Sequence, residues 1–181
     1  MTSPGPGSRV LAAGRHLTFL DLDGWEYVRR PGITGIAILV AVTPEGAILL
    51  VEQRRPAVGA RVVELPAGLC GDDPAHPGEP LEEAARRELL EETGWEAERV
   101  ERLTAGPPSA GVSSEIVTFF RAWGLARRGS GGGVAGESIT VHEVPLDAAP
   151  AWLHAREAAG TLVDPKVWAG IYFAGVRLCL F

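Results

Sequence analysis

The order of apolar and turn-forming segments predicts an α/β (α+β) fold, in which a mixed β-sheet lies between helices as an α/β/α sandwich. Three observations support this prediction. Short apolar runs of strand length recur through the first two thirds of the chain. One segment of strong helix formers, residues 80–93, interrupts them. Two further helical segments, residues 150–157 and those from 165 onward, follow the last strand.

The strands expected before the central helix fall into two groups. Residues 17–22 and 25–30 flank the turn pair Asp23-Gly24 and predict a hairpin. Residues 35–42 and 47–53 are continuous apolar runs around a Pro-Glu-Gly turn, and they predict a buried antiparallel pair. Residues 62–65 form a further short strand.

These patterns divide the chain into three parts. Residues 1–13 are expected to form a flexible tail, because Gly, Pro and Ser dominate their start. Residues 14–33 form an N-terminal β arm, and residues 34–181 form the main domain. At 181 residues the chain is long enough for a core of its own.

After the helix, strands are expected at residues 101–105, 116–122 and 139–144. A long loop at 106–114 separates the first two. The glycine-rich segment 129–133 lacks the Lys-Ser/Thr of a P-loop, so we interpret it as a hinge or loop tip and not as a phosphate cradle.

Composition excludes several classes of partner. A net charge of −6 argues against a nucleic-acid backbone. No apolar run reaches the roughly 20 residues that span a bilayer, and the N-terminus lacks the features of a secretory signal. Two cysteines, Cys70 and Cys179, do not make a disulfide framework. This usage is consistent with a reducing, cytoplasmic location.

The central helix carries charges that do not favour its own stability. Glu88 and Glu92 repel each other at i,i+4, which costs about 0.2–0.5 kcal/mol, and neither has a basic residue three or four positions away. Glu91 crowds the same side, near the helix end where the dipole disfavours anions. A solvated acidic face is one explanation. A hard divalent cation such as Mg²⁺, with Mn²⁺ as a substitute, is the other, because all the available donors are oxygens.

This stretch resembles the Nudix hydrolase signature, Gly-x5-Glu-x7-Arg-Glu-U-x-Glu-Glu-x-Gly-U. The second half matches from Glu79 through Arg87-Glu88-Leu89-Leu90-Glu91-Glu92-Thr93-Gly94-Trp95. The first half departs, since Asp73 stands where the signature has Gly. Gly68 is the better candidate, with ten residues before Glu79 in place of five. Residues 69–78 are therefore interpreted as a loop with a five-residue insertion, and the resemblance implies the Nudix fold.

Stretches outside the signature look like those of ADP-ribose pyrophosphatases. They are residues 53–59 and 63–68, the loop 108–115, and residues 24–29 of the arm. In that subfamily the arm swaps between the subunits of a homodimer and helps to bind the adenine. The resemblance implies Mg²⁺-dependent hydrolysis of ADP-ribose to AMP and ribose 5-phosphate. Two alternatives stay open: another substrate (FAD, NADH, a GDP-sugar or a nucleoside triphosphate), or a non-catalytic domain that binds a nucleotide.

The resemblance and the residue chemistry together predict the site. The expected metal ligands are the Ala67 carbonyl, Glu88, Glu91, Glu92 and Glu115. The expected catalytic residues are Glu137 as the general base, Glu115 as a metal-linked or assisting group, and Glu91. The expected substrate contacts are Arg54, Arg55, Glu64, Gly68, Gly111 and Trp25, of which Trp25 is equally well read as a dimer contact. Glu79, Arg87 and Gly94 are expected to be structural.

Overall fold

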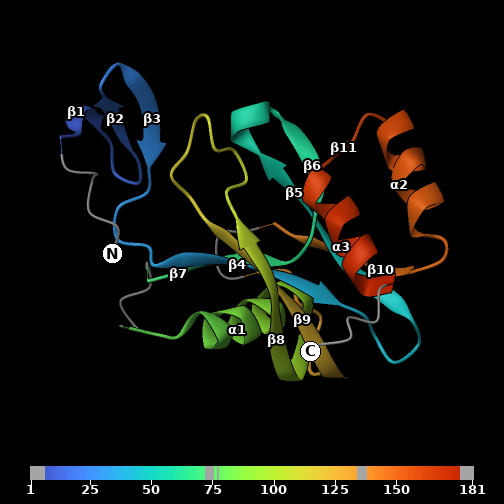
Figure 1. Ribbon diagram of the computed structural model, residues 1–181. Coiled ribbons are helices and arrows are strands. Elements are labelled where there is room, and N and C mark those ends of the chain that lie inside the picture. Colours follow the sequence, from blue (N-terminus) through green and yellow to red (C-terminus); the bar gives the residue numbers. More distant parts are fainter. Residues whose placement is uncertain (1–6, 72–75, 77, 134–137, 176–181) are drawn as a thin grey trace.

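The computed structural model describes residues 7–71, 76, 78–133 and 138–175. Its core holds two four-stranded sheets. The first has the order β7 (Ala67–Cys70), β4 (Gly35–Ala41), β9 (Val117–Arg127), β8 (Trp95–Gly106), and the second has the order β10 (Thr140–Pro145), β5 (Ala47–Arg55), β6 (Ala60–Glu64), β11 (Leu162–Val163). A 3₁₀ turn, Pro56–Val58, joins β5 to β6. Helix α1 (Leu81–Thr93) lies on one side of the sheets, and α2 (Ala149–Ala158) and α3 (Pro165–Gly175) lie on the other (Figure 1). The predicted mixed sheet between helices is therefore confirmed.

Strand β4 lies at the centre of this arrangement. Ile38 and Val40 pack into the core beneath α2 and α3, whereas Ala37, Leu39 and Ala41 pack into the core beneath α1. Burial on both faces explains why its sequence is a continuous apolar run without polar alternation. Because β4 pairs in parallel with β9 and antiparallel with β7, the first sheet is mixed.

The expected antiparallel pair of residues 35–42 and 47–53 is wrong. The turn between them forms, with a single bridge from Val42 to Ile48, but β4 and β5 then enter different sheets. Strand β5 pairs with β10 and β6 instead. Both runs are apolar on both faces, so their sequences do not specify which strands lie along their edges, and non-local pairing decides the outcome.

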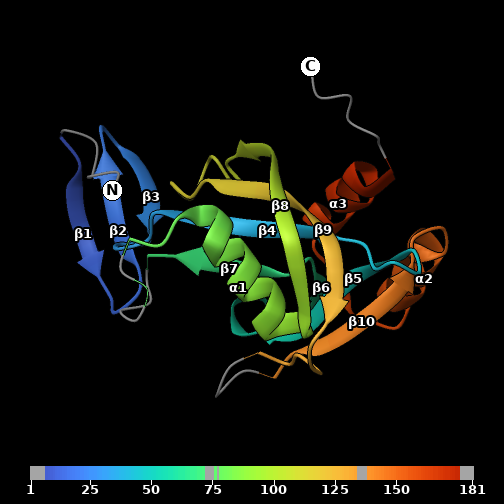
Figure 2. The ribbon, with the colours of Figure 1, turned by 90° about the horizontal axis from the view of Figure 1, so that it is seen from below.

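The N-terminal arm is a three-stranded sheet at the side of the molecule, β1 (Arg9–Ala13), β2 (Thr18–Leu22) and β3 (Trp25–Arg29) (Figures 1 and 2). The hairpin predicted around Asp23-Gly24 is present, with φ of 52° and 87° at these two residues, as a tight hairpin turn requires. Residues 9–13, expected in the flexible tail, instead form β1 and pair with β2.

Helix α1 begins at Leu81 after Pro80 and ends at Thr93, where Gly94 has a φ of 74° and donates its N–H to the Leu90 carbonyl. Helix α3 starts as predicted, with the Lys166 N–H donating to Asp164 Oδ1 at 2.8 Å. It was expected to reach Phe181, but residues 176–181, including Cys179, lie outside the described part of the chain. Within the described residues, no helix is long and apolar enough to cross a bilayer.

Candidate active site

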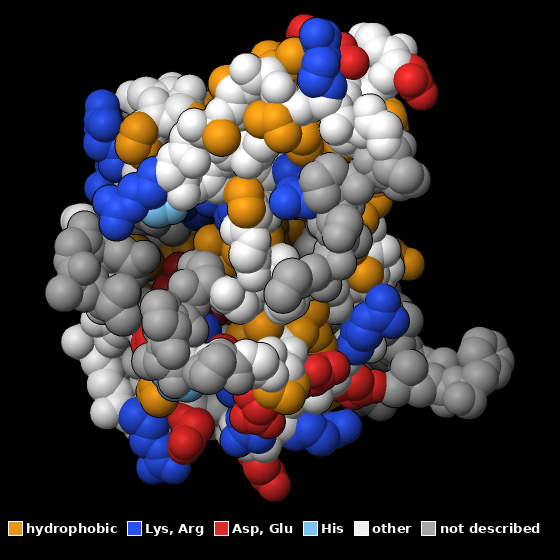
Figure 3. Space-filling view, turned by 90° about the vertical axis from the view of Figure 1, so that its left-hand side faces the viewer, with side chains coloured by type: hydrophobic (Ala, Val, Ile, Leu, Met, Phe, Trp, Pro, Cys, Tyr) orange, Lys and Arg blue, Asp and Glu red, His pale blue; other side chains and the backbone are white. Residues whose placement is uncertain are grey.

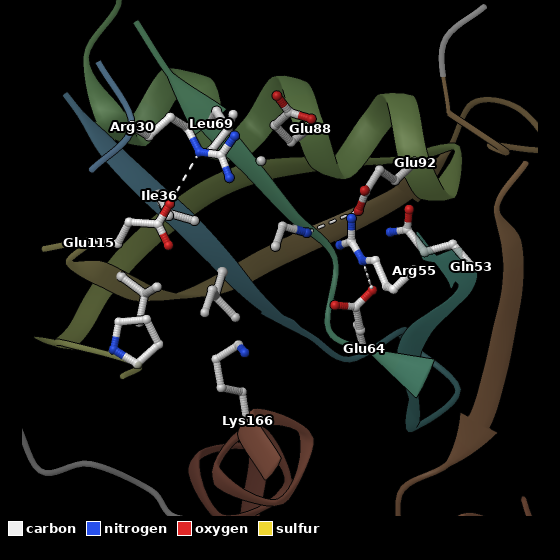
Figure 4. A pocket seen from close by; sticks show the side chains of 15 residues that line it. Arg30, Ile36, Gln53, Arg55, Glu64, Leu69, Glu88, Glu92, Glu115 and Lys166 are labelled. Atoms are coloured by element: carbon white, nitrogen blue, oxygen red, sulfur yellow. Dashed lines mark hydrogen bonds and ion pairs between the residues drawn. The ribbon is translucent and has the colours of Figure 1, made fainter. Parts of the chain in front are cut away.

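A pocket of about 460 Å³ lies beside β4 and β7 of the first sheet, and two carboxylates of α1 form one of its walls (Figure 4). Residues from seven helices and strands and from two loops line it. They are Arg30, Ile36, Ile38, Gln53, Arg55, Glu64, Ala67, Gly68, Leu69, Glu88, Glu92, Pro108, Glu115, Val117 and Lys166. Apolar side chains from β4 and β9 therefore form part of the lining, and charged side chains converge from the surrounding elements.

Helix α1 contributes the acidic wall through Glu88 and Glu92, which lie one turn apart. Glu92 is 6% exposed, and its Oε2 accepts a hydrogen bond from the Ala67 N–H at 3.0 Å. Glu88 lies directly against Gly68, since a Cβ at residue 68 would come within 1.9 Å of Glu88 Cδ. Gly68 is therefore needed for the Glu88 carboxylate to fold against β7.

Arg87 forms hydrogen bonds with Glu88 and with two further carboxylates of the signature, those of Glu79 and Glu91. Its guanidinium donates to both oxygens of Glu79, at 3.3 and 3.1 Å, to Glu88 Oε1 at 2.9 Å and to Glu91 Oε2 at 3.2 Å. Burial alone would lower the pKa of Arg87, but the hydrogen bonds to Glu79 and the charge of Glu88 outweigh it and raise the pKa above its ordinary value. Arg87 thus stays charged and links three carboxylates of the signature, those of Glu79, Glu88 and Glu91. One of them, Glu88, is its neighbour in the sequence.

Basic side chains reach the pocket from three other directions (Figure 4). Arg55 at the end of β5 donates to Glu64 at 2.8 Å. Lys166 extends from the first turn of α3 and forms an ion pair with Asp164. Arg30, just after β3, donates to Glu115 at 3.1 Å. The acidic wall of α1 therefore faces three cations across one cavity.

The loop that carries Glu115 is attached to the N-terminal sheet by its backbone. The Val28 N–H donates to the Val112 carbonyl at 2.8 Å, and the Ser114 N–H donates to the Val28 carbonyl at 3.1 Å. The Ser113 hydroxyl accepts from the Glu115 N–H at 3.1 Å. Strand β3 therefore positions both Arg30 and the loop that presents Glu115.

The chemical type of the available ligands, carboxylate oxygens, fits a hard divalent cation. Glu88, Glu92 and Glu115 all line the pocket and offer only oxygen donors, which suits Mg²⁺ or Mn²⁺. In the described parts of the chain no three acidic, histidine or cysteine side chains already converge on one point. Glu88 and Glu91 are instead turned toward Arg87.

Most of the predicted site residues meet here. Ala67, Glu88, Glu92, Glu115, Arg55, Glu64 and Gly68 all line the pocket. Arg54, Gly111 and Trp25 are not among the lining residues, and Glu91 lies beside the pocket, bound to Arg87. Glu79, Arg87 and Gly94 occupy the ion-pair and helix-end positions described above. Glu137, the first candidate for the general base, lies outside the described residues.

Sequence reasoning missed Arg30, Gln53 and Lys166 as lining residues. Gln53 is the first residue of the recognised stretch 53–59, although no role was assigned to it, and Lys166 directly follows the Asp164-Pro165 helix start. Nothing local in the sequence separates Arg30 from its neighbour Arg29.

An α/β/α sandwich whose carboxylate-bearing helix faces a pocket lined by cations is the arrangement that the signature led us to expect. Residues 33–162 match the profile of the NUDIX domain family, and the chain belongs to that family. The resemblance seen in the sequence is thereby confirmed.

Three relatives illustrate the similarity. The methanol dehydrogenase activator of Bacillus methanolicus is 36% identical over 68% of this chain and 63% of its own length. The ADP-ribose pyrophosphatase of Bacillus subtilis is 42% identical over 54% of this chain and 48% of its own length. The GDP-mannose pyrophosphatase of Yersinia enterocolitica is 32% identical over 79% of this chain and 74% of its own length. The chain thus spans between about half and two thirds of the length of the first two.

A solved structure described as an ADP compounds hydrolase superposes with a TM-score of 0.63. It is 21% identical, and the match covers 81% of this chain and 80% of that one. At this level of identity the likeness establishes the fold.

Proposed function

We propose that this protein hydrolyses the pyrophosphate bond of a nucleoside diphosphate derivative, with ADP-ribose as the leading substrate and AMP and ribose 5-phosphate as products. One observation carries the proposal: Glu88 and Glu92 line the same pocket as Arg30, Arg55 and Lys166. Carboxylates suit a divalent cation, and the basic side chains suit the phosphate oxygens around it. The similarity to an ADP-ribose pyrophosphatase supports the choice of substrate.

Glu88 and Glu92, with the Ala67 carbonyl and with Glu91 and Glu115 as further candidates, would hold Mg²⁺, or Mn²⁺ in its place. A bound ion of this kind neutralises phosphate charge and lowers the pKa of a coordinated water. Arg55 has the planar guanidinium that can clamp a phosphate through two parallel hydrogen bonds. Its partner Glu64 is only 15% exposed and keeps the guanidinium at the pocket. Lys166 supplies a second positive charge from α3.

The attacking water needs a proton acceptor. Among the described residues Glu115 is suited to this role, because it lines the pocket and is held beside Arg30 (Figure 4). Its ion pair with Arg30 leaves the carboxylate 21% exposed and able to meet water. Glu137 remains the alternative proposed from the sequence.

A GDP-sugar is the second candidate substrate. It is favoured by the similarity to a GDP-mannose pyrophosphatase, of which this chain covers 74%. The same carboxylates and cations would serve either substrate, because both contain a diphosphate bridge. The base and the sugar are what distinguish them.

We also propose a homodimer that forms through the N-terminal sheet. Several large apolar side chains on this sheet and the adjoining turn are at least one-third exposed, and Figure 3 shows hydrophobic side chains at several places over this part of the surface. They are Val10, Leu11, Leu17, Phe19 and Trp25. A small sheet needs a surface to pack on, and a second copy would provide one. A cytoplasmic location stays a prediction from the cysteine usage.

The decisive experiment is a panel of nucleotides assayed with Mg²⁺, with Mn²⁺ and with a chelator. The panel contains ADP-ribose, GDP-mannose, FAD, NADH and a nucleoside triphosphate, and the products are identified by chromatography. We expect turnover of ADP-ribose to AMP and ribose 5-phosphate in equal amounts, abolished by the chelator. Preferred turnover of GDP-mannose would move the assignment to the second candidate. Binding of nucleotides without turnover of any of them would reject the enzyme and support the non-catalytic alternative.

A further inference from the structure

The glycine-rich segment 129–133 does not form a free loop tip. It packs against the C-terminal end of α1, the helix that carries the pocket carboxylates. The Gly132 N–H donates to the Glu92 carbonyl at 2.8 Å, and the Gly133 N–H donates to the Glu91 carbonyl at 3.1 Å. Just before them, the N–H groups of Arg128 and Gly129 both donate to the Gly94 carbonyl, at 2.8 and 3.1 Å. Four backbone hydrogen bonds therefore join residues 128–133 to the helix end.

The close approach depends on Gly131. This residue has a φ of +67°, and a Cβ built on it would lie 2.4 Å from the Thr93 carbonyl carbon, 2.5 Å from the Glu92 carbonyl oxygen and 2.6 Å from the Thr93 Cα. All three are backbone atoms of the last helical turn, so no side-chain rotation can relieve the clash. A side chain at residue 131 must move the segment away from α1 or shift the helix end itself.

The carbonyls that accept these hydrogen bonds include those of Glu91 and Glu92, whose side chains are proposed cation ligands. The last four carbonyls of a helix lack intrahelical partners, and their negative partial charge disfavours nearby anions. Glu91 and Glu92 lie in that turn, and their own carbonyls are the ones that receive the N–H groups of Gly133 and Gly132. The contacts therefore fix the backbone beneath two carboxylates and reduce the unfavourable field on them.

We propose that residues 129–133 are a positioning segment for the cation-binding carboxylates of α1. By holding the last turn of the helix, they keep Glu92 at the depth where it meets Ala67 and faces the pocket. This inference rests on the proposed function only in so far as α1 binds a divalent cation. A chain that binds the cation but does not hydrolyse nucleotides would retain the segment's role.

The test is Gly131→Ala, with Gly129→Ala as the matched control. Residue 129 belongs to the same segment, has no positive φ, and has no heavy atom within 4 Å of a built Cβ. Mn²⁺ binding to the full chain is measured directly by electron paramagnetic resonance of the free ion, and folding is followed by thermal melting. We expect Gly131→Ala to weaken Mn²⁺ binding by about tenfold or more, as loss of a group that orients metal ligands does, and Gly129→Ala to bind like the wild type. The inference is overturned if Gly131→Ala melts at a lower temperature but binds Mn²⁺ with unchanged affinity.

A second measurement on the wild-type protein does not depend on a variant that folds. Hydrogen exchange of the peptide covering residues 128–133 is followed by mass spectrometry with and without Mg²⁺. If the segment and the carboxylates are coupled, Mg²⁺ slows this exchange together with that of the last turn of α1. Exchange that Mg²⁺ leaves unchanged in this peptide contradicts the proposal.

The two experiments separate this inference from the proposed function. A wild-type protein that turns over ADP-ribose, with a Gly131→Ala variant that binds Mn²⁺ normally, overturns the inference alone. A wild-type protein that binds Mn²⁺ without turning over any nucleotide overturns the proposed function alone, and the Gly131→Ala comparison still decides the inference. A wild-type protein that binds no Mn²⁺ overturns both.

Discussion

Two clusters of carboxylates and cations in this molecule, one around Glu52 and one at α1, have opposite balances of charge. On strand β5, Glu52 is 3% exposed and is surrounded by cations. Arg61 donates to it at 2.6 Å, His142 lies within hydrogen-bond distance at 3.0 Å, and Arg156 forms an ion pair with it. On α1, the single guanidinium of Arg87 serves three carboxylates, and Glu92 lies beside them at the pocket.

The difference is consistent with a structural role for Glu52 and with the cation-binding role that we propose for the α1 carboxylates. Burial alone would raise the pKa of Glu52, but the hydrogen bonds from Arg61 and His142 and the charge of Arg156 outweigh it and lower the pKa below its ordinary value of 4.5. That carboxylate has its full complement of positive charge within the fold. The α1 wall has more negative than positive charge, and a divalent cation would redress the balance.

Glu92→Gln should reduce nucleotide turnover by at least about a hundredfold, because an amide is a poor ligand for a hard cation. The fold should be unaffected or slightly more stable, since the amide oxygen can still accept from the Ala67 N–H and the repulsion from Glu88, about 0.2–0.5 kcal/mol, is removed. Steady-state kinetics and thermal melting measure the two effects. Glu82→Gln, on the exposed side of the same helix, is the charge-matched control. Equal losses of activity and stability would contradict the assignment.

Glu52→Gln should show the reverse pattern. Removing this charge leaves Arg61, Arg156 and His142 without their shared partner, and we expect a loss of about 2 kcal/mol in the free energy of unfolding. The loss is smaller than for a fully buried ion pair, because Arg61 is 43% exposed and water screens its charge. Urea denaturation measures it, and Mn²⁺ affinity should stay unchanged. Glu157→Gln, an exposed partner of His154 on α2, should cost less than about 0.5 kcal/mol. A Glu52 variant as stable as the wild type would refute the structural role.

Two adjacent arginines at the end of β5, Arg54 and Arg55, differ in their relation to the pocket. Both Arg54 and Arg55 are exposed, but Arg55 lines the pocket and pairs with Glu64, whereas Arg54 is not among the lining residues. Arg55→Ala should raise the KM for the diphosphate substrate by about tenfold, because a guanidinium–phosphate contact is lost. Arg54→Ala should change it little. Kinetics of the two variants side by side provide the test, and equal effects would mean that general positive charge, and not the pocket, attracts the substrate.

The pH dependence of stability gives the smallest signal. A folded-state pKa that is lowered means that the ionised Glu52 stabilises the protein above the unfolded pKa, and that this contribution is lost as the pH falls through the folded value. The stability gap between wild type and Glu52→Gln should therefore be constant near neutral pH and should close progressively below about pH 4.5. Urea titrations at several pH values measure it. A gap that widens on acidification would reverse the sign and exclude this explanation.

The features of the fold that could be predicted from the sequence are those set by residues close together in the chain. The end of α1 at Gly94, the turn at Asp23-Gly24 and the start of α3 after Asp164 each depend on one or two residues with strong conformational preferences. The separation of β4 from β5 was not predictable in this way, because both runs are apolar and only long-range packing chooses their partners.

The same division applies to the site. Glu88 and Glu92 could be recognised because their spacing on one helix places them on one face. Arg30 and Lys166 could not, since they reach the pocket from opposite ends of the chain and each resembles an ordinary surface cation in its own segment. The glycine-rich segment looked like a loop tip because its docking partner lies over thirty residues earlier in sequence.

The attachment of the Glu115 loop to β3 has a practical consequence for how this chain is divided. The region shared with the family profile begins at residue 33 and ends at residue 162. Arg30 lies before that region and Lys166 after it, and the backbone that anchors residues 112 and 114 is contributed by Val28. A protein trimmed to the shared boundaries would keep its acidic helix but lose two of three cations and the support of one wall. The pocket therefore extends beyond the family region, and a fragment cut at those boundaries would lack part of the pocket lining.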